Sequence, residues 1–150
     1  MPPWHNNFSP IVKNMSPVES LHYAIGELAY IMARVDGKVQ KEEREKFQNM
    51  VAAELRCKDY GFDVTDIIFQ LLDKQRKDLD VGTTYGWAMH EIRLNGHYLS
   101  PKLKKNFTRF LEKIAKAYPP VTVEEKNIID RFKEDIALIK GDPVFYGIHK

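Results

Sequence analysis

Residues 21–50 read LHYAIGELAYIMARVDGKVQKEEREKFQNM, and their apolar pattern indicates the fold class of the chain. Its first half is apolar at steps of three and four residues, the spacing that places side chains on one face of a helix. Asp36-Gly37 then ends the helix, because glycine takes the left-handed conformation past a helix C-terminus at little cost. A second helix is expected over about residues 40–56, with apolar positions facing the core and a charged outer face. The stretch therefore predicts a helical hairpin.

The same pattern recurs later in the chain. Laid without gaps on residues 103–132, an offset of 82, residues 21–50 are identical at five positions and keep the apolar register at others. A register preserved through a helix, a loop and a second helix predicts two similar hairpins packed around a pseudo-twofold axis. Convergent amphipathic patterning would produce the same match. The identical pairs are Leu21/Leu103, Ala33/Ala115, Val39/Val121, Glu42/Glu124 and Glu43/Glu125.

Capping residues mark where several helices begin. Ser16 and Ser100 each precede a proline, which combines an N-cap hydroxyl with the residue best suited to the first helical position. Thr122 stands three residues before Glu125, the spacing of a capping box. Thr83 or Thr84 is the expected cap of a further helix that breaks near Asn95-Gly96.

No segment shows the alternation of a half-buried strand, and apolar spacing predicts one more helix over about residues 64–72. We therefore expect an all-α domain of about six to seven helices with two similar helical hairpins. It spans residues 16–141, between an extended N-terminal tail, 1–15, and a C-terminal tail, 142–150.

Composition restricts the cellular location of the protein more than it restricts its function. The chain has 150 residues and a net charge of +2, so only a local face, and not the whole surface, can attract a charged partner. Cys57 is the one cysteine, and no stretch reaches the roughly 20 apolar residues of a membrane span. The first thirty residues lack the pattern of a secretory leader. These features predict a cytoplasmic protein.

The loop of the first hairpin carries a family resemblance. Its pattern of alanine, Asp-Gly, a β-branched residue and a Glu pair resembles the signature of the TerB-like family of tellurite-resistance and stress-associated domains, a hairpin shared by the N-terminal region of some DnaJ-type co-chaperones. The resemblance covers about residues 16–140 and implies an all-helical, non-enzymatic accessory or scaffold domain of a stress-response or membrane-associated system. Tyr118-Pro119-Pro120 and Gln40 depart from the pattern. The matching residues are Ala33, Asp36, Gly37, Val39, Glu42 and Glu43, then Ala115, Val121, Glu124 and Glu125.

The resemblance also implies a candidate divalent-metal site at Asp36, Glu42 and Glu43. A calcium-binding EF-hand loop is excluded there, because Met32 and Arg34 would occupy its first and third ligand positions. The competing interpretation is structural, with the two glutamates favoured by the helix dipole in the first turn of the second helix. We expect no cofactor apart from such a metal.

Catalytic motifs are missing from the sequence. His90 and His97 lie seven residues apart, but Leu94 stands where a zinc-protease helix needs its second histidine. No phosphate loop or nucleophile elbow occurs, so we predict a non-enzymatic protein. An uncatalogued enzyme would require a cleft that gathers these histidines with acidic side chains.

A stripe of cations runs along the helix expected over residues 101–118. Its members recur at steps of three and four residues, which puts them on one face. Such a face can meet an acidic protein or anionic lipid headgroups, and the competing interpretation is an ordinary solvated helix back. Nucleic acid is disfavoured, because no aromatic residue interleaves with the cations on the same face of the helix. We call these residues the basic stripe: Lys102, Lys105, Arg109, Lys113 and Lys116.

Overall fold

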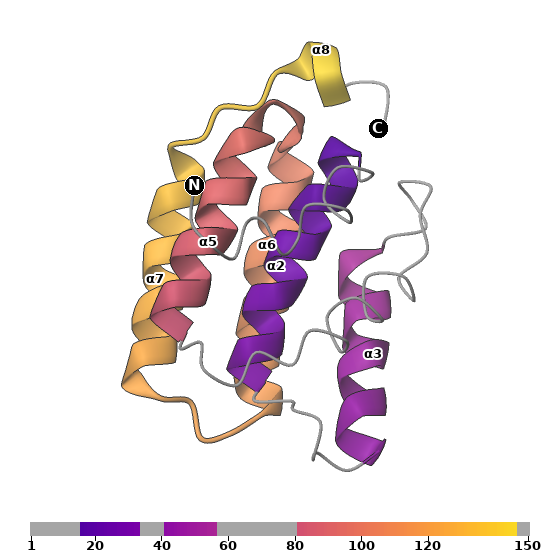
Figure 1. Cartoon of the computed structure of the whole chain (residues 1–150), viewed down its shortest axis with the longest axis vertical. Helices are drawn as coiled ribbons and strands as arrows, with labels where there is room; N and C mark the ends of the chain where they lie inside the picture. The colour runs from indigo at the N-terminus through magenta and orange to yellow at the C-terminus, as the bar shows by residue number, and fades with distance from the viewer. Residues whose placement is uncertain (1–15, 34–40, 57–80, 147–150) are drawn as a thin grey trace.

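The protein is represented by a computed structural model that describes residues 16–33, 41–56 and 81–146. Within these ranges all regular structure is helical and no strand occurs, so the predicted all-α class is confirmed (Figure 1). The helix expected near residues 64–72 and the N-terminal tail lie outside the described residues. The elements are α2 (Pro17–Ala33), α3 (Lys41–Leu55), α5 (Val81–Leu94), the 3-10 turn η2 (Gly96–Tyr98), α6 (Pro101–Ala117), α7 (Val123–Ala137) and α8 (Pro143–Tyr146).

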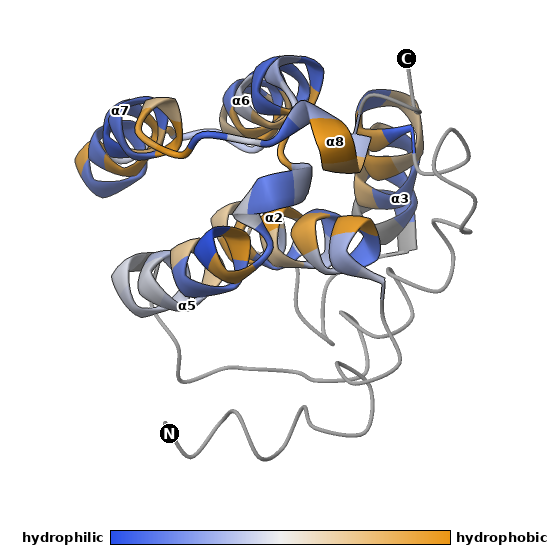
Figure 2. Ribbon diagram, turned by 90° about the horizontal axis from the view of Figure 1, so that it is seen from above, coloured by the Kyte–Doolittle hydropathy of each residue, from blue (hydrophilic) through white to orange (hydrophobic). Residues whose placement is uncertain are grey.

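The central helix is α2, as its nearly continuous apolar surface predicts. Fourteen of its 17 residues are buried, because α5, α6 and α3 pack around it. Seen from above, α2 and α5 form one layer, α6 and α7 form the other, and α3 closes one side (Figure 2). This arrangement leaves the outer faces of α6 and α7 to solvent.

Three of the expected caps are present. Ser16 Oγ accepts a hydrogen bond from Glu19 N, and Ser100 Oγ accepts one from Leu103 N. Thr122 and Glu125 form the full capping box, with the reciprocal bonds at 3.0 and 3.1 Å. The fourth expectation is wrong, since α5 begins at Val81 and Thr83 and Thr84 lie inside it. An N-cap residue has non-helical dihedral angles, so neither threonine can serve as one.

The two hairpins agree in helix length and in part of their register. Their first helices, α2 and α6, have 17 residues each, and their second helices, α3 and α7, have 15. At the offset of 82, α3 and α7 begin and end at equivalent positions. All seven buried residues of α6 correspond to buried residues of α2, among them Phe107 with Ile25 and Phe110 with Leu28.

The second helices bury faces that differ in part. Phe47 and Ile129 are both buried, but Val51 is buried where its counterpart Lys133 is exposed. The reason is their different neighbours. Helix α3 packs against α6 and α2, whereas α7 packs against α6 and α5. The apolar face of α7 is therefore rotated about the helix axis relative to the apolar face of α3.

Positions 22 and 104, which are equivalent in the two hairpins, each contact a backbone carbonyl near the end of the second helix. The His22 ring approaches Leu55 O, the last carbonyl of α3, through Nε2 at 3.2 Å, and Val18 O through Nδ1 at 2.8 Å. Lys104 stands 82 residues later, and its Nζ donates to Ile139 O, just past the end of α7. His22 therefore contacts a C-terminal carbonyl of α3, which has no intrahelical partner, and Lys104 contacts a carbonyl two residues beyond α7.

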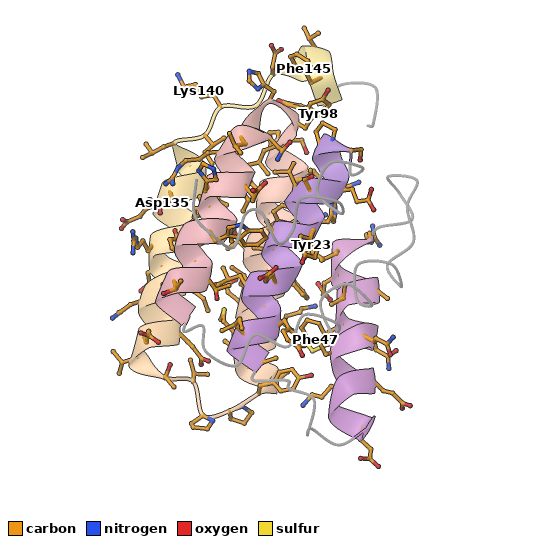
Figure 3. The ribbon with its side chains drawn as sticks, in the orientation of Figure 1. Tyr23, Phe47, Tyr98, Asp135, Lys140 and Phe145 are labelled. Carbon is orange, nitrogen blue, oxygen red and sulfur yellow. The ribbon has the colours of Figure 1, made fainter. Side chains whose placement is uncertain are left out.

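The C-terminal segment folds back over one end of the bundle. Asp142 N donates to His97 O at 2.9 Å, and the Phe145 ring packs on the rings of His97 and Tyr98 at 5.3 and 5.2 Å (Figure 3). Part of the segment that the sequence assigns to a tail is thus the short helix α8.

Candidate functional site

The basic stripe lies on the solvent side of α6. Its five cations are all exposed, because α6 turns its apolar residues toward the core. The structure therefore brings the five predicted residues together on one face. Lys102, Lys105 and Lys116 make no ion pair within the described part of the chain.

Two members of the stripe are engaged by α3. Glu54 lies 3.6 Å from Arg109 Nε and 2.8 Å from Lys113 Nζ, and its side chain is only 17% exposed. The Arg109 guanidinium also donates to Asn106 Oδ1 at 3.0 Å. These two cations therefore help to hold α3 on α6, which is a structural role that the sequence did not predict.

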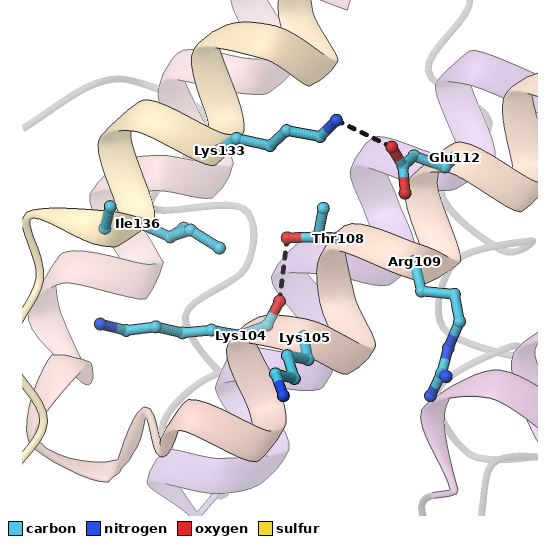
Figure 4. Close-up of a pocket in the computed structure, with 8 residues that line it drawn as sticks. Lys104, Lys105, Thr108, Arg109, Glu112, Lys133 and Ile136 are labelled. Atoms are coloured by element: carbon cyan, nitrogen blue, oxygen red, sulfur yellow. Dashed lines mark hydrogen bonds and ion pairs between the residues drawn. The ribbon is translucent and has the colours of Figure 1, made fainter.

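A groove runs beside the stripe, between α6 and α7, and has a volume of about 350 Å³ (Figure 4). Its walls carry four cationic side chains and a single carboxylate, and Ile136 and Ala137 supply apolar surface. Thr108 donates to Lys104 O at 2.9 Å, so its hydroxyl proton is already used. The groove is lined by Lys104, Lys105, Thr108, Arg109, Glu112, Lys133, Ile136 and Ala137.

The cations of the groove differ in how far they are engaged. Lys133 forms a 2.8 Å ion pair with Glu112 across one part of the groove, and Lys104 binds Ile139 O. Lys105 has no such contact among the described residues, so its ammonium group is available to an incoming anion. Cations lining a groove with low-dielectric walls concentrate anions there.

Lys104 and Lys133 are the groove cations that the sequence did not reveal. Lys104 follows Leu103 directly and therefore falls off the three- and four-residue spacing of the stripe. Lys133 belongs to another helix, and only the packing of α7 on α6 brings it near Lys105. The repeat offered one signal, because Lys104 occupies the position equivalent to His22.

The proposed metal residues are not assembled in the described part of the structure. Glu42 is exposed on α3, whereas Asp36 and the side chain of Glu43 lie outside the described residues. Across residues 16–33, 41–56 and 81–146, no group of three His, Cys, Asp or Glu side chains is placed to hold a metal. In the second hairpin the counterpart of Glu43 is Glu125, whose carboxylate is occupied by the capping box.

The two histidines of the enzyme alternative are both exposed, and neither lines the groove. His90 projects from α5, and the ring of His97 packs on Phe145. The groove is lined instead by lysine and arginine side chains with one carboxylate and one hydroxyl.

A second charged cluster, centred on Asp135, holds α5 against α7. Asp135 accepts the hydroxyl hydrogen bond of buried Tyr85 and lies 3.8 Å from Arg93 and 3.9 Å from Arg131. Burial, reinforced by the bond to Asp135, raises the pKa of Tyr85 well above its ordinary value, so the hydroxyl stays protonated. The Arg131 guanidinium covers the Tyr85 ring at 5.0 Å. The contacts of Asp135 with Tyr85 and Arg93 join α7 to α5, which gives this cluster a structural role.

Comparison of the chain with family models, with curated proteins and with solved structures found no match. None of the described helices is both long enough and apolar enough to cross a bilayer.

Proposed function

We propose that this chain is a TerB-like binding domain that works in the cytoplasm as an accessory component of a stress-response system, without catalytic activity of its own. It docks an acidic protein partner on the outer face of α6. The loop pattern at Ala33, Asp36, Gly37, Val39, Glu42 and Glu43 supports the family, as does the all-helical pair of similar hairpins.

The observation that carries the binding role is the exposed basic stripe beside a cation-lined groove. With a net charge of only +2, the chain has no general excess of cations, so their concentration on α6 is local. A face of one sign of charge speeds encounter with an oppositely charged partner and discriminates against others. Affinity on such a face falls with added salt, because exposed charges are screened.

The test compares two forms of the tagged native chain in co-purification from the native cell. In the variant, Lys102, Lys105 and Lys116 are each replaced by Gln, since these are the stripe cations without an ion pair in the described structure. Arg109 and Lys113 stay unchanged, because their loss would leave half-buried Glu54 without its cations.

We expect one acidic partner to be recovered by the wild-type chain at low salt and to be lost with the triple variant and at high salt. Thermal unfolding of the variant at the wild-type temperature would show that the fold is intact. Recovery of every partner in equal amounts by both forms would contradict the proposal.

A further inference from the structure

We infer that the groove between α6 and α7 is a docking cleft for a short acidic peptide segment that carries one apolar anchor. This inference rests on the proposed function, because it names the part of the basic face that the partner occupies. The shape, the charge distribution and the apolar wall of the groove each favour such a segment.

The shape fits a rod-like segment. The groove follows α6 from Lys104 to Glu112, and eight residues of helix rise about 12 Å. It is open along its length and walled by two neighbouring helices, α6 and α7 (Figure 4). A peptide of two helical turns, or about four extended residues, matches this length.

The charges fit carboxylates at one end of that segment. Lys105 and Arg109 lie about one helical turn apart, whereas the other end of the groove holds the neutralised pair of Glu112 and Lys133. A carboxylate at this end of a peptide would therefore meet Lys105. The Arg109 side chain reaches away from α7 toward Glu54 of α3, so it adds positive charge at the rim of the groove (Figure 4).

The apolar wall distinguishes a peptide from a lipid surface. Ile136 and Ala137 lie on the α7 side of the groove, where an aliphatic side chain between the carboxylates can pack on them. A flat anionic membrane would instead contact the crest of α6, where Lys102 and Lys116 are as accessible as Lys105. The two occupants therefore depend on different residues.

The experiment measures binding of a fluorescein-labelled helical peptide of about twelve residues by anisotropy at low salt. The peptide has Glu pairs one helical turn apart and a single Leu between them. A second peptide with Gln in place of every Glu is the charge control. Lys105→Gln and Lys116→Gln form a matched pair of variants, because both remove one exposed charge from α6 and only Lys105 lines the groove.

We expect Lys105→Gln to weaken binding about threefold to fivefold and Lys116→Gln by less than about twofold. Ala137→Trp, at an exposed position on the groove wall, should abolish binding by filling the groove without disturbing the core. Glu112→Gln should strengthen binding, because it removes the one carboxylate in the groove and frees Lys133.

If Lys105→Gln and Lys116→Gln weakened binding equally and Ala137→Trp bound like the wild type, the groove would not be the docking site. The proposed function would still stand, with the partner bound across the whole basic face. Binding to phosphatidylserine vesicles in place of the peptide would also overturn it. If the wild-type chain bound neither the acidic peptide nor the vesicles, the inference would be overturned, and the co-purification experiment would still decide the proposed function.

Discussion

The two helical hairpins, α2 with α3 and α6 with α7, share their first helices and differ in their second. All seven core positions of α6 are matched in α2, because both helices face the same central core. In the second helices, Glu54 of α3 stands where α7 has buried Ile136. A shared core therefore preserves the register of buried residues, whereas a helix that packs on a different neighbour buries a different face.

The same contrast separates structure from function. His22 and Lys104 stand at equivalent positions and both contact a carbonyl at the end of the second helix. In the first hairpin the position is fully buried and holds an imidazole that packs on Phe107. In the second it is half-buried and lines the groove. The first hairpin has therefore closed over this position, and the second has left it accessible to a ligand.

The largest effects should come from the shared register. Ile25 and Phe107 are equivalent and both fully buried. We expect Ile25→Ala to lower the free energy of unfolding by about 2–5 kcal/mol and Phe107→Ala by about 3–5 kcal/mol, measured by urea denaturation. Lys102→Ala, on the exposed side of α6, is the control and should change it by less than about 0.5 kcal/mol. A small loss at either core position would break the equivalence of the first helices.

The next prediction concerns the pH dependence of stability at His22, whose counterpart in the second hairpin is Lys104. Burial outweighs the contacts with Val18 O and Leu55 O and lowers the pKa of His22 from 6.5 to about 4. Protonation therefore favours the unfolded chain. The neutral His22 ring therefore contributes its full share of the free energy of unfolding above about pH 6.5. This share is lost as the pH falls to 4, which lowers the free energy of unfolding by about 3 kcal/mol.

Urea denaturation of the wild type and of His22→Gln across this range tests the assignment. The variant should lose this part of the pH dependence, because glutamine does not titrate. His90→Gln, at an exposed position on α5, should keep the wild-type dependence. The assignment would be wrong if His22→Gln retained the full loss of stability toward pH 4.

A third prediction contrasts Ile136 with its counterpart Glu54. Ile136→Ala should reduce the free energy of unfolding by about 2–4 kcal/mol, because its side chain is buried in the core. Glu54→Ala should lower the free energy of unfolding by less than about 1 kcal/mol, because the side chains of its partners Arg109 and Lys113 are at least half exposed. Chemical denaturation of both variants gives the comparison. Similar losses would show that the two second helices share one register after all.

Much of this fold follows from local sequence, and much of the site does not. The caps at Ser16, Ser100 and Thr122 depend on neighbouring residues, so their positions could be predicted. The exposure of the basic stripe likewise follows from the periodicity of one helix. The groove could not be predicted, because it requires Lys133 from another helix. The pairing of Glu54 with two stripe residues depends in the same way on how α3 packs on α6.

The smallest expected effect sharpens the contrast between the two hairpin loops. The first loop carries Asp36, with Glu42 and Glu43 beyond it, whereas Tyr118-Pro119-Pro120 replaces the Asp-Gly turn in the second. Proline fixes φ and removes a backbone donor, so an acidic metal site built on the loop is expected only in the first hairpin. If that loop is a structural connector, calcium or magnesium at about 1 mM should change Tm by less than about 1 °C, because neither ion binds the native state selectively.

Differential scanning fluorimetry of the wild type, of Asp36→Asn combined with Glu43→Gln, and of Glu124→Gln measures this effect. Glu124 is the control because it is exposed in the first turn of α7, at the position equivalent to Glu42. All three proteins should have the same Tm with and without the ion, apart from any fixed offset caused by the substitutions. A saturable rise that Asp36→Asn with Glu43→Gln abolishes and Glu124→Gln preserves would instead place a metal site on the first hairpin. The two hairpins would then each carry a ligand site, a metal on the first loop and an anion beside α6.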